Sequence, residues 1–307
     1  MVGIGDDAAV LAPEAASLVL TVDAAVEGMH FRRDWMSLED VGFRSLMAAA
    51  SDLAAMGARP RGVLSALVLP ADFGDEELDR LARGQAEAAL ALGTAVVGGN
   101  LARGSELSVT TTVVGAADKP LLRAGAKPGD VVAIAGPLGL AAAGIAALRR
   151  DERGAPFERV LAAYRRPRAL IEEGVDAAAR AHAAIDVSDG LALDASRLAA
   201  ESGVGIVLEA ERIRAAAGTE LRAAASALSL DPLELALYGG DDYALFAAFA
   251  PGDLAPAFTM IGHCTVETGM VLEGADGTWR PLAPRGYDHF VDTLAIPVHR
   301  ARTRRGQ

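Results

Sequence analysis

Eight aspartates lie in five short segments that otherwise consist mainly of glycine, alanine and aliphatic residues, and none of the segments contains Lys or Arg. An ionised carboxylate in apolar surroundings is costly unless a positive charge meets it. The 307-residue chain has 29 basic and 41 acidic residues, so we expect the counter-charge to come from outside the protein. Hard divalent cations, above all Mg²⁺, bind carboxylates together with substrate phosphates. The segments are residues 3–11, 20–28, 51–57, 184–190 and 239–245.

Asp beside Gly also caps helices and forms turns, and for any one segment this explanation would suffice. Five such segments together favour metal binding. Residues 184–190 give the sharpest local signal, because Asp186, Ser188 and Asp189 lie at the carboxyl end of a predicted strand, where the next helix begins. Open α/β sheets bind ligands at this position, and a helix N-terminus offers backbone donors to phosphate oxygens. Two carboxylates repel each other there, which favours a cation over a simple N-cap.

Residues 97–104 (VGGNLARG) are predicted to form a glycine loop after a strand at 94–97. Such a loop lets the backbone approach a phosphate closely, but by itself it is a weak signal. Arg123 is equally compatible with a phosphate contact and with a solvated side chain, and a lone His30 is more often structural. The chain contains no P-loop, no spaced G-x-G-x-x-G in a strand–helix context and no G-x-S-x-G motif. His263 and Cys264 are predicted to pack in the core.

Candidate metal ligands without an obvious nucleophile or general base favour phosphoryl transfer. That reaction depends on positioning and charge neutralisation rather than on covalent help.

The hydrophobic pattern predicts an α/β fold of two layered domains. The first half is predicted as β-α-β-α-β-β, with strands at 17–26, 61–69, 94–97 and 107–115 and helices at 38–56 and 75–92. Ser37 with Asp40 is a candidate N-cap pair for the first helix. A linker at 117–130 leads to a second α/β unit. Its predicted strands are 131–135, 183–187, 205–208, 243–249 and 258–262, and its helices lie within 139–182 and at 191–201 and 231–238. We therefore expect domains at 1–117 and 118–307, with a solvated basic tail at about 300–307.

A net charge of -12 argues against nucleic acid or an anionic membrane as a partner. Residues 131–148 carry no charge over eighteen positions, but Gly136, Pro137 and Gly139 interrupt them. This stretch is better explained as strand, turn and helix than as a membrane span. One cysteine excludes a disulfide framework and a zinc cluster, and Asp6 and Asp7 stand where an export signal needs positive charge. A cytoplasmic location is expected.

The ordered motifs GIGDDAAVL, LTVDAAVEGMHF, SDLAAMGARP, VVGGNLARG, RAGAKPGD, AIDVSDG, GGDDY and GYDHF cover nearly the whole chain. In this order the sequence resembles the thiamine-monophosphate kinases, of the superfamily that includes aminoimidazole ribonucleotide synthetase. The resemblance implies transfer of the ATP γ-phosphoryl group to thiamine monophosphate, with several Mg²⁺ ions. It also implies a homodimer formed through the N-terminal domains.

The resemblance further implies roles for individual residues. The implied metal ligands are Asp7, Thr21, Val22, Asp23, Asp52, Asn100, Asp186 and Asp189. The implied nucleotide contacts are Gly99, Asn100, Arg123 and Ser188, and the implied thiamine contacts are His30, Asp241 and Tyr287. No residue is expected to act as a covalent nucleophile.

Three positions depart from the family pattern. Asn100 stands where Asp is common, Asp241 where Glu is common, and Val22 where a second Thr is common. Asn100 removes one negative charge from the expected metal site. Two alternatives therefore stay open: another ATP-dependent enzyme of the superfamily, or a thiamine-phosphate-binding protein with weakened catalysis.

Overall fold

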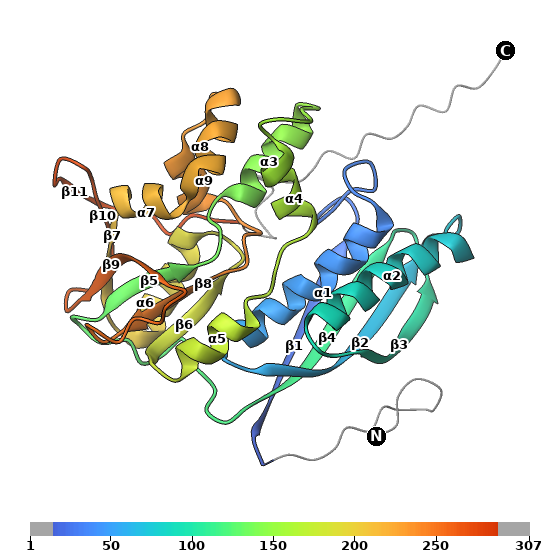
Figure 1. Ribbon diagram of the computed structural model, residues 1–307, viewed down its shortest axis with the longest axis horizontal. Coiled ribbons are helices and arrows are strands. Elements are labelled where there is room, and N and C mark those ends of the chain that lie inside the picture. Colours follow the sequence, from blue (N-terminus) through green and yellow to red (C-terminus); the bar gives the residue numbers. More distant parts are fainter. Residues whose placement is uncertain (1–14, 288–307) are drawn as a thin grey trace.

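Two β-sheets, one from each half of the chain, form the framework of the molecule (Figure 1). The computed structural model describes residues 15–287. Asp6, Asp7 and the expected basic tail lie outside the described residues. The two-sheet architecture agrees with the predicted α/β fold.

The first sheet has four strands in the order β1-β4-β2-β3. Its strands are β1 (Ser17–Val26), β2 (Arg59–Leu69), β3 (Val96–Arg103) and β4 (Ser108–Ala117). The helices α1 (Leu38–Ala55) and α2 (Asp75–Ala91) cover one face (Figure 1). β4 alternates between buried and half-buried residues, as expected for a central strand rich in Val and Thr. The opposite face carries exposed apolar residues, among them Leu18, Leu20, Val22 and Leu64.

The helix α1 begins as the sequence predicts. The Ser37 hydroxyl accepts a hydrogen bond from the amide of Asp40, whose carboxylate accepts one from the amide of Ser37. Gly84 in α2 lets the two helices approach closely, since a Cβ there would lie 1.9 Å from the carbonyl oxygen of Glu39.

The predicted glycine loop at residues 97–104 is wrong. Most of this segment belongs to β3, which pairs in parallel with β2 at the edge of the sheet. Gly99 is needed there for close approach rather than for a turn, because a Cβ would lie 1.8 Å from the carbonyl oxygen of Ser65. A glycine within a strand often marks such a close approach of another backbone segment.

The second sheet has seven strands in the order β11-β10-β7-β9-β5-β8-β6. They are β5 (Val131–Ala135), β6 (Ala181–Val187), β7 (Gly205–Glu209), β8 (Ala244–Phe249), β9 (Thr259–Thr265), β10 (Gly269–Glu273) and β11 (Trp279–Pro281). Cys264 is buried in β9, as expected for a core position. The strands β10 and β11 were not predicted.

Seven helices accompany this sheet within the described residues. They are α3 (Leu140–Arg149), α4 (Glu158–Arg165), α5 (Ile171–Ala178), α6 (Leu191–Ser202), α7 (Ala210–Ala216), α8 (Gly218–Ala227) and α9 (Pro232–Tyr238). Figure 1 shows α3, α4, α7, α8 and α9 gathered on one side of the sheet. The uncharged stretch at 131–148 forms β5, a glycine turn and α3, as predicted. Within residues 15–287, no helix has the length and apolar character needed to span a bilayer.

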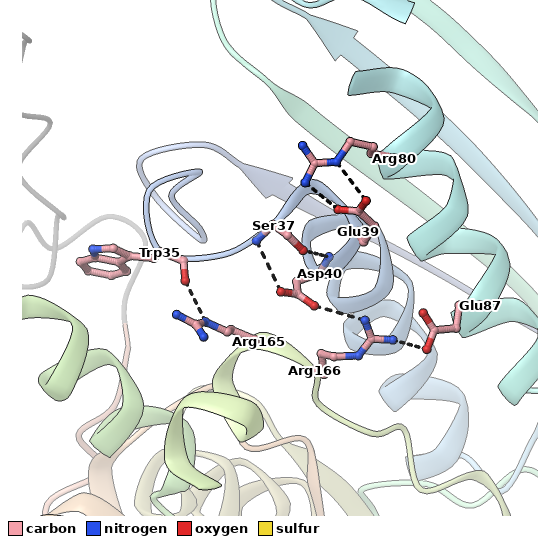
Figure 2. A network of polar contacts seen from close by, with 8 residues as sticks. All are labelled: Trp35, Ser37, Glu39, Asp40, Arg80, Glu87, Arg165 and Arg166. Carbon is pink, nitrogen blue, oxygen red and sulfur yellow. Dashed lines mark hydrogen bonds and ion pairs between the residues drawn. The ribbon is translucent and has the colours of Figure 1, made fainter. Parts of the chain in front are cut away.

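Polar contacts join the two halves beside α1 (Figure 2). Arg166, just after α4, bonds to Asp40 of α1 at 3.2 Å and also pairs with Glu87 of α2. The Nε of Arg165 donates to the carbonyl oxygen of Trp35 at 2.8 Å. The end of α4 is thereby fixed against both helices of the first sheet.

Candidate functional site

Two cavities meet at the carboxylates of Asp52 and Asp186, which line both of them. The larger cavity has a volume of about 820 Å³ and the smaller one about 520 Å³. Asp52 lies in the last turn of α1, and Asp186 lies near the carboxyl end of β6. Residues from the two halves of the chain therefore build one site.

A hydroxyl group donates a hydrogen bond to each carboxylate. The Thr21 hydroxyl of β1 donates to Asp52 Oδ2 at 2.5 Å. The Ser51 hydroxyl of α1 donates to Asp186 Oδ2 at 2.9 Å. Ser51 and Asp52 are adjacent in α1. This helix therefore carries the Asp52 carboxylate and also binds the Asp186 carboxylate from the other half of the chain.

The electrostatics of this pair favour a bound cation. Burial and, after it, the nearby charge of Asp52 raise the pKa of Asp186 to about 7, although the hydrogen bond from Ser51 opposes the shift. Burial likewise raises the pKa of Asp52; Thr21 opposes this shift and Asp23 adds to it. Asp52 also lies at the C-terminal end of α1, where the helix dipole disfavours a negative charge and the last turn has no basic residue. A divalent cation would relieve each of these unfavourable interactions.

The donor chemistry fits Mg²⁺. The groups at hand are carboxylate and hydroxyl oxygens, which hard cations prefer. Within residues 15–287, no three His, Cys, Asp or Glu side chains are already arranged around one metal position. The site therefore matches Mg²⁺ in the type of its ligand atoms and in its negative charge.

The expectation that the counter-charge comes from outside the protein is wrong for Asp241 and Asp189. Arg44 of α1 forms an ion pair with Asp241 at 2.7 Å. Arg197 of α6 contacts Asp189 Oδ2 at 2.6 Å and also bonds to Asp194. Arg44 is far from Asp241 in the sequence, and Arg197 lies in the helix that follows Asp189. Neither arginine belongs to an acidic segment, so inspection of the segments alone did not reveal these pairs.

Asp242 has a structural position instead of facing a cleft. Its two carboxylate oxygens accept hydrogen bonds from the amides of Gly139 and Ala141, at 2.5 and 3.3 Å. The side chain is buried and caps the start of α3 from a distant part of the chain. The capping explanation, set aside for these segments as a group, is correct for this residue.

The larger cavity contains the expected thiamine contacts. His30, Asp241 and Tyr287 line it together, although they come from three separate parts of the chain. The Nδ1 of His30 accepts a hydrogen bond from the amide of Val26 at 3.1 Å, which leaves the proton on Nε2 as a donor. Four more expected site residues also line this cavity: Val22, Asp23, Ser188 and Asp189.

Arg123 lines the smaller cavity, together with Thr21. Its loop is held by Ser202 at the end of α6. The Ser202 hydroxyl donates to the carbonyl oxygen of Arg123 at 2.8 Å and accepts from the amides of Gly125 and Ala126 at 3.2 and 3.1 Å. The segment expected to contact the nucleotide thus has a fixed anchor.

Gly99 and Asn100 do not belong to this cluster within one chain. They lie on β3, whereas Thr21 and Asp23 lie on β1, and the strand order puts β1 and β3 at opposite edges of the sheet. Neither residue is part of the lining of the two cavities. Asp7 lies outside the described residues.

Sequence reasoning missed three residues that support the site: Arg44, Asp194 and Ser202. Arg44 is the one charged residue within residues 41–50, and this was a usable signal. Asp194 accepts hydrogen bonds from the amides of Asp189 and Gly190. Neither Asp194 nor Ser202 stands out by residue type, because their roles depend on contacts that only the fold creates.

The chain matches two family models, which together cover most of its length. AIR synthase related protein, N-terminal domain, matches residues 5–117, and AIR synthase related protein, C-terminal domain, matches residues 127–259. A thiamine-monophosphate kinase of Mycobacterium tuberculosis is 37% identical over 266 residues, which cover 86% of this chain and 79% of the relative. The Aquifex aeolicus enzyme of the same name is 33% identical, with 94% of this chain and 92% of the relative covered.

The solved structure of AaThiL complexed with AMPPCP and TMP superposes with a TM-score of 0.84 at 30% identity, and covers 91% of this chain and 89% of that one. Sequence and fold therefore agree over nearly the whole length. The chain belongs to the thiamine-monophosphate kinase family within the AIR synthase-related proteins.

Proposed function

We propose that this protein transfers the γ-phosphoryl group of ATP to thiamine monophosphate, which yields thiamine diphosphate and ADP. The observation that carries the proposal is the pair of cavities that meet at Asp52 and Asp186. Two phosphate-bearing substrates, one in each cavity, would bring their phosphates together at this pair. The complex of AaThiL with AMPPCP and TMP supports the same pair of ligands.

In this proposal the larger cavity takes thiamine monophosphate. His30 supplies an Nε2–H donor, and Asp241 supplies a carboxylate close to a substrate whose thiazolium ring is cationic. Tyr287 closes the same cavity, and its amide donates to the carbonyl oxygen of Asp189 at 2.9 Å. The smaller cavity takes the nucleotide, with Arg123 as a bidentate phosphate contact. Further nucleotide contacts are assigned to Ser188, Gly99 and Asn100.

The acceptor needs no general base. A phosphate monoester is largely ionised near neutral pH, because its second pKa is about 6. The barrier is the repulsion between two anions, and Mg²⁺, when bound, neutralises this charge and aligns the two groups. The residues of the chain hold the ions and orient both substrates, and transfer is direct and in line, without a phosphoenzyme. The proposed ligands are Asp7, Thr21, Val22 through its carbonyl oxygen, Asp23, Asp52, Asn100, Asp186 and Asp189.

We assign residues 1–117 to an ATP-, Mg²⁺-binding and dimerisation domain, and residues 118–307 to a domain that completes the site. The apolar face of the first sheet supports a homodimer, since Leu18, Leu20 and Val22 are 65%, 65% and 63% exposed. Two such faces packed together would bury these side chains. A second copy would also explain Asn100, because the β3 edge of one copy can approach the β1 edge of the other.

The test is ADP formation from ATP and Mg²⁺ with thiamine monophosphate as acceptor. Metal-dependent turnover that requires thiamine monophosphate supports the proposal. Thermal stabilisation by thiamine monophosphate without turnover identifies a binding protein instead. Turnover only with a different acceptor identifies another ATP-dependent enzyme of the superfamily. Either of the last two results contradicts the proposed function.

A further inference from the structure

Arg44 is a buried cation in the centre of the molecule. It lies on α1, and its side chain is 5% exposed. Burial lowers the pKa of this guanidinium, but the charge of Asp241 and the oxygens of Tyr243 and Tyr164 outweigh it and raise the pKa. Arg44 is therefore charged, and a buried charge is retained only where its partners are well placed.

The partners of Arg44 belong to the other half of the chain. Its Nη2 pairs with Asp241 Oδ1 at 2.7 Å, and its Nη1 donates to the carbonyl oxygen of Tyr164 in α4 at 2.5 Å. The guanidinium also lies over the rings of Tyr164 and Tyr243, at 4.6 and 5.8 Å from their centroids. One side chain of the first domain thus contacts two separate segments of the second.

These contacts determine how Asp241 enters the larger cavity. The Tyr243 hydroxyl donates to Asp241 Oδ1 at 3.0 Å, the same oxygen that Arg44 contacts. Oδ1 is thereby engaged twice, and Oδ2 is the oxygen that a ligand in the cavity can use. Asp241 and Tyr243 also have positive φ angles of 69° and 52°, a backbone conformation that residues other than glycine adopt only uncommonly. Such a backbone persists only where the surroundings enforce it.

The same arginine also supports a second part of the cavity wall, formed by Tyr164 and His30. Tyr164, which the guanidinium covers, donates from its hydroxyl to the carbonyl oxygen of His30 at 3.1 Å. Arg44, Tyr164 and His30 therefore form a continuous chain of contacts that crosses the domain boundary. Arg44 itself is absent from the lining of the cavity.

We propose that Arg44 is a positioning residue for the acceptor substrate, which acts through Asp241 and the Tyr164–His30 wall without contacting the substrate. This inference rests on the proposed function. A positioning role predicts a selective defect, because the smaller cavity and Arg123 do not depend on these contacts.

The experiment compares Arg44→Lys, Arg44→Met and Asp241→Asn with wild type, and measures KM separately for thiamine monophosphate and for ATP. Lysine keeps the charge but cannot reach two partners in a planar fork. Arg44→Lys should raise KM for thiamine monophosphate by about tenfold, with KM for ATP changed by less than about threefold. Arg80→Met is the matched control. Arg80 forms an ion pair with Glu39 of α1 at an N–O distance of 2.9 Å (Figure 2), and neither residue lines either cavity. This control should leave both constants unchanged.

The double variant Arg44→Met/Asp241→Asn decides whether Arg44 acts through Asp241. If it does, the KM of the double variant for thiamine monophosphate lies below the product of the two single fold-changes, because each single variant already loses the Arg44–Asp241 contact. Any rise beyond Asp241→Asn alone measures the part that Arg44 exerts through the Tyr164–His30 wall. The double variant also removes both charges, so no unpaired carboxylate remains at the cavity, and it keeps the inference testable where Arg44→Met alone fails to fold. Equal changes in both KM values, or no change in either, would overturn the inference. Wild type that fails to turn over thiamine monophosphate would instead overturn the proposed function.

Discussion

Asp241 and Asp242 are neighbours in the sequence with separate tasks. Asp241 is held at the larger cavity by Arg44, whereas Asp242 is buried against the start of α3. Burial raises the pKa of Asp242 to about 8, although the amides of Gly139 and Ala141 oppose the shift. This pair illustrates that residue type and spacing alone do not assign a role to an acidic side chain.

Removal of the Asp242 carboxyl group should destabilise the fold. Asp242→Ala leaves two buried amides without an acceptor, and should lower the free energy of unfolding by about 2 kcal/mol. Asp242→Asn keeps one acceptor and should lose less. Urea denaturation of the three proteins measures the difference. Equal stability of wild type and Asp242→Ala would contradict the capping role.

The same residue predicts a pH dependence. The folded-state pKa of Asp242, about 8, lies above the usual 3.8, so between about pH 4 and 8 the folded state holds a proton that the unfolded state has lost. This contribution to stability is therefore present at low pH and is lost as the pH rises through 8. Asp242→Asn cannot titrate, so the melting temperature of wild type relative to this variant should fall between pH 5 and 8. A constant difference would contradict the raised pKa.

Asp52 should be needed for catalysis and not for folding. Asp52→Asn removes a carboxylate that lies close to Asp186 and Asp23. Turnover should fall about a hundredfold or more, because a ligand of the proposed metal site is lost. Without metal the variant should melt at or above the wild-type temperature, since like-charge repulsion is relieved, and Mg²⁺ should no longer stabilise it. Calorimetry with and without Mg²⁺ checks both statements; an unfolded variant would favour a structural role.

At the scale of elements, the loop of residues 123–126 depends on the end of α6. Ser202→Ala removes one hydroxyl that bonds to three backbone groups of this loop. We expect KM for ATP to rise about fivefold, which corresponds to about 1 kcal/mol, because Arg123 is no longer held in place. KM for thiamine monophosphate is the internal control and should stay constant. An unchanged KM for ATP would show that the loop does not position Arg123 for the nucleotide.

Elements were predictable where the local pattern has a single explanation. The apolar run at 131–148 was correctly divided because glycines separate a strand pattern from an alanine helix. The segment at 97–104 was misjudged because glycine favours both loops and close strand packing, and only pairing with β2 distinguishes them. In the site, Asp52 and Asp186 lie in a helix and a strand that were both predicted from the sequence. The ion pair of Asp241 with Arg44 was not predicted, because it joins residues far apart in the sequence.

At the scale of the whole molecule, the uncovered face of the first sheet should mediate dimerisation. Leu18→Glu places a charge among apolar residues of that face, where Leu18 is 65% exposed. In sedimentation or light-scattering measurements the variant should be monomeric, whereas wild type should be dimeric. Leu90→Glu is the control, because Leu90 is 80% exposed on α2, which covers the other face. A dimeric Leu18→Glu protein would exclude this face as the interface.

Asp52 and Asp186 line both cavities. A charged ligand that binds next to this pair in one cavity changes the electrostatic potential in the other cavity. The affinities for the two ligands must therefore be thermodynamically linked. Such linkage is reciprocal: the factor by which the first ligand changes the affinity for the second equals the factor by which the second changes the affinity for the first. Titrations performed in either order of addition should therefore close the same free-energy cycle.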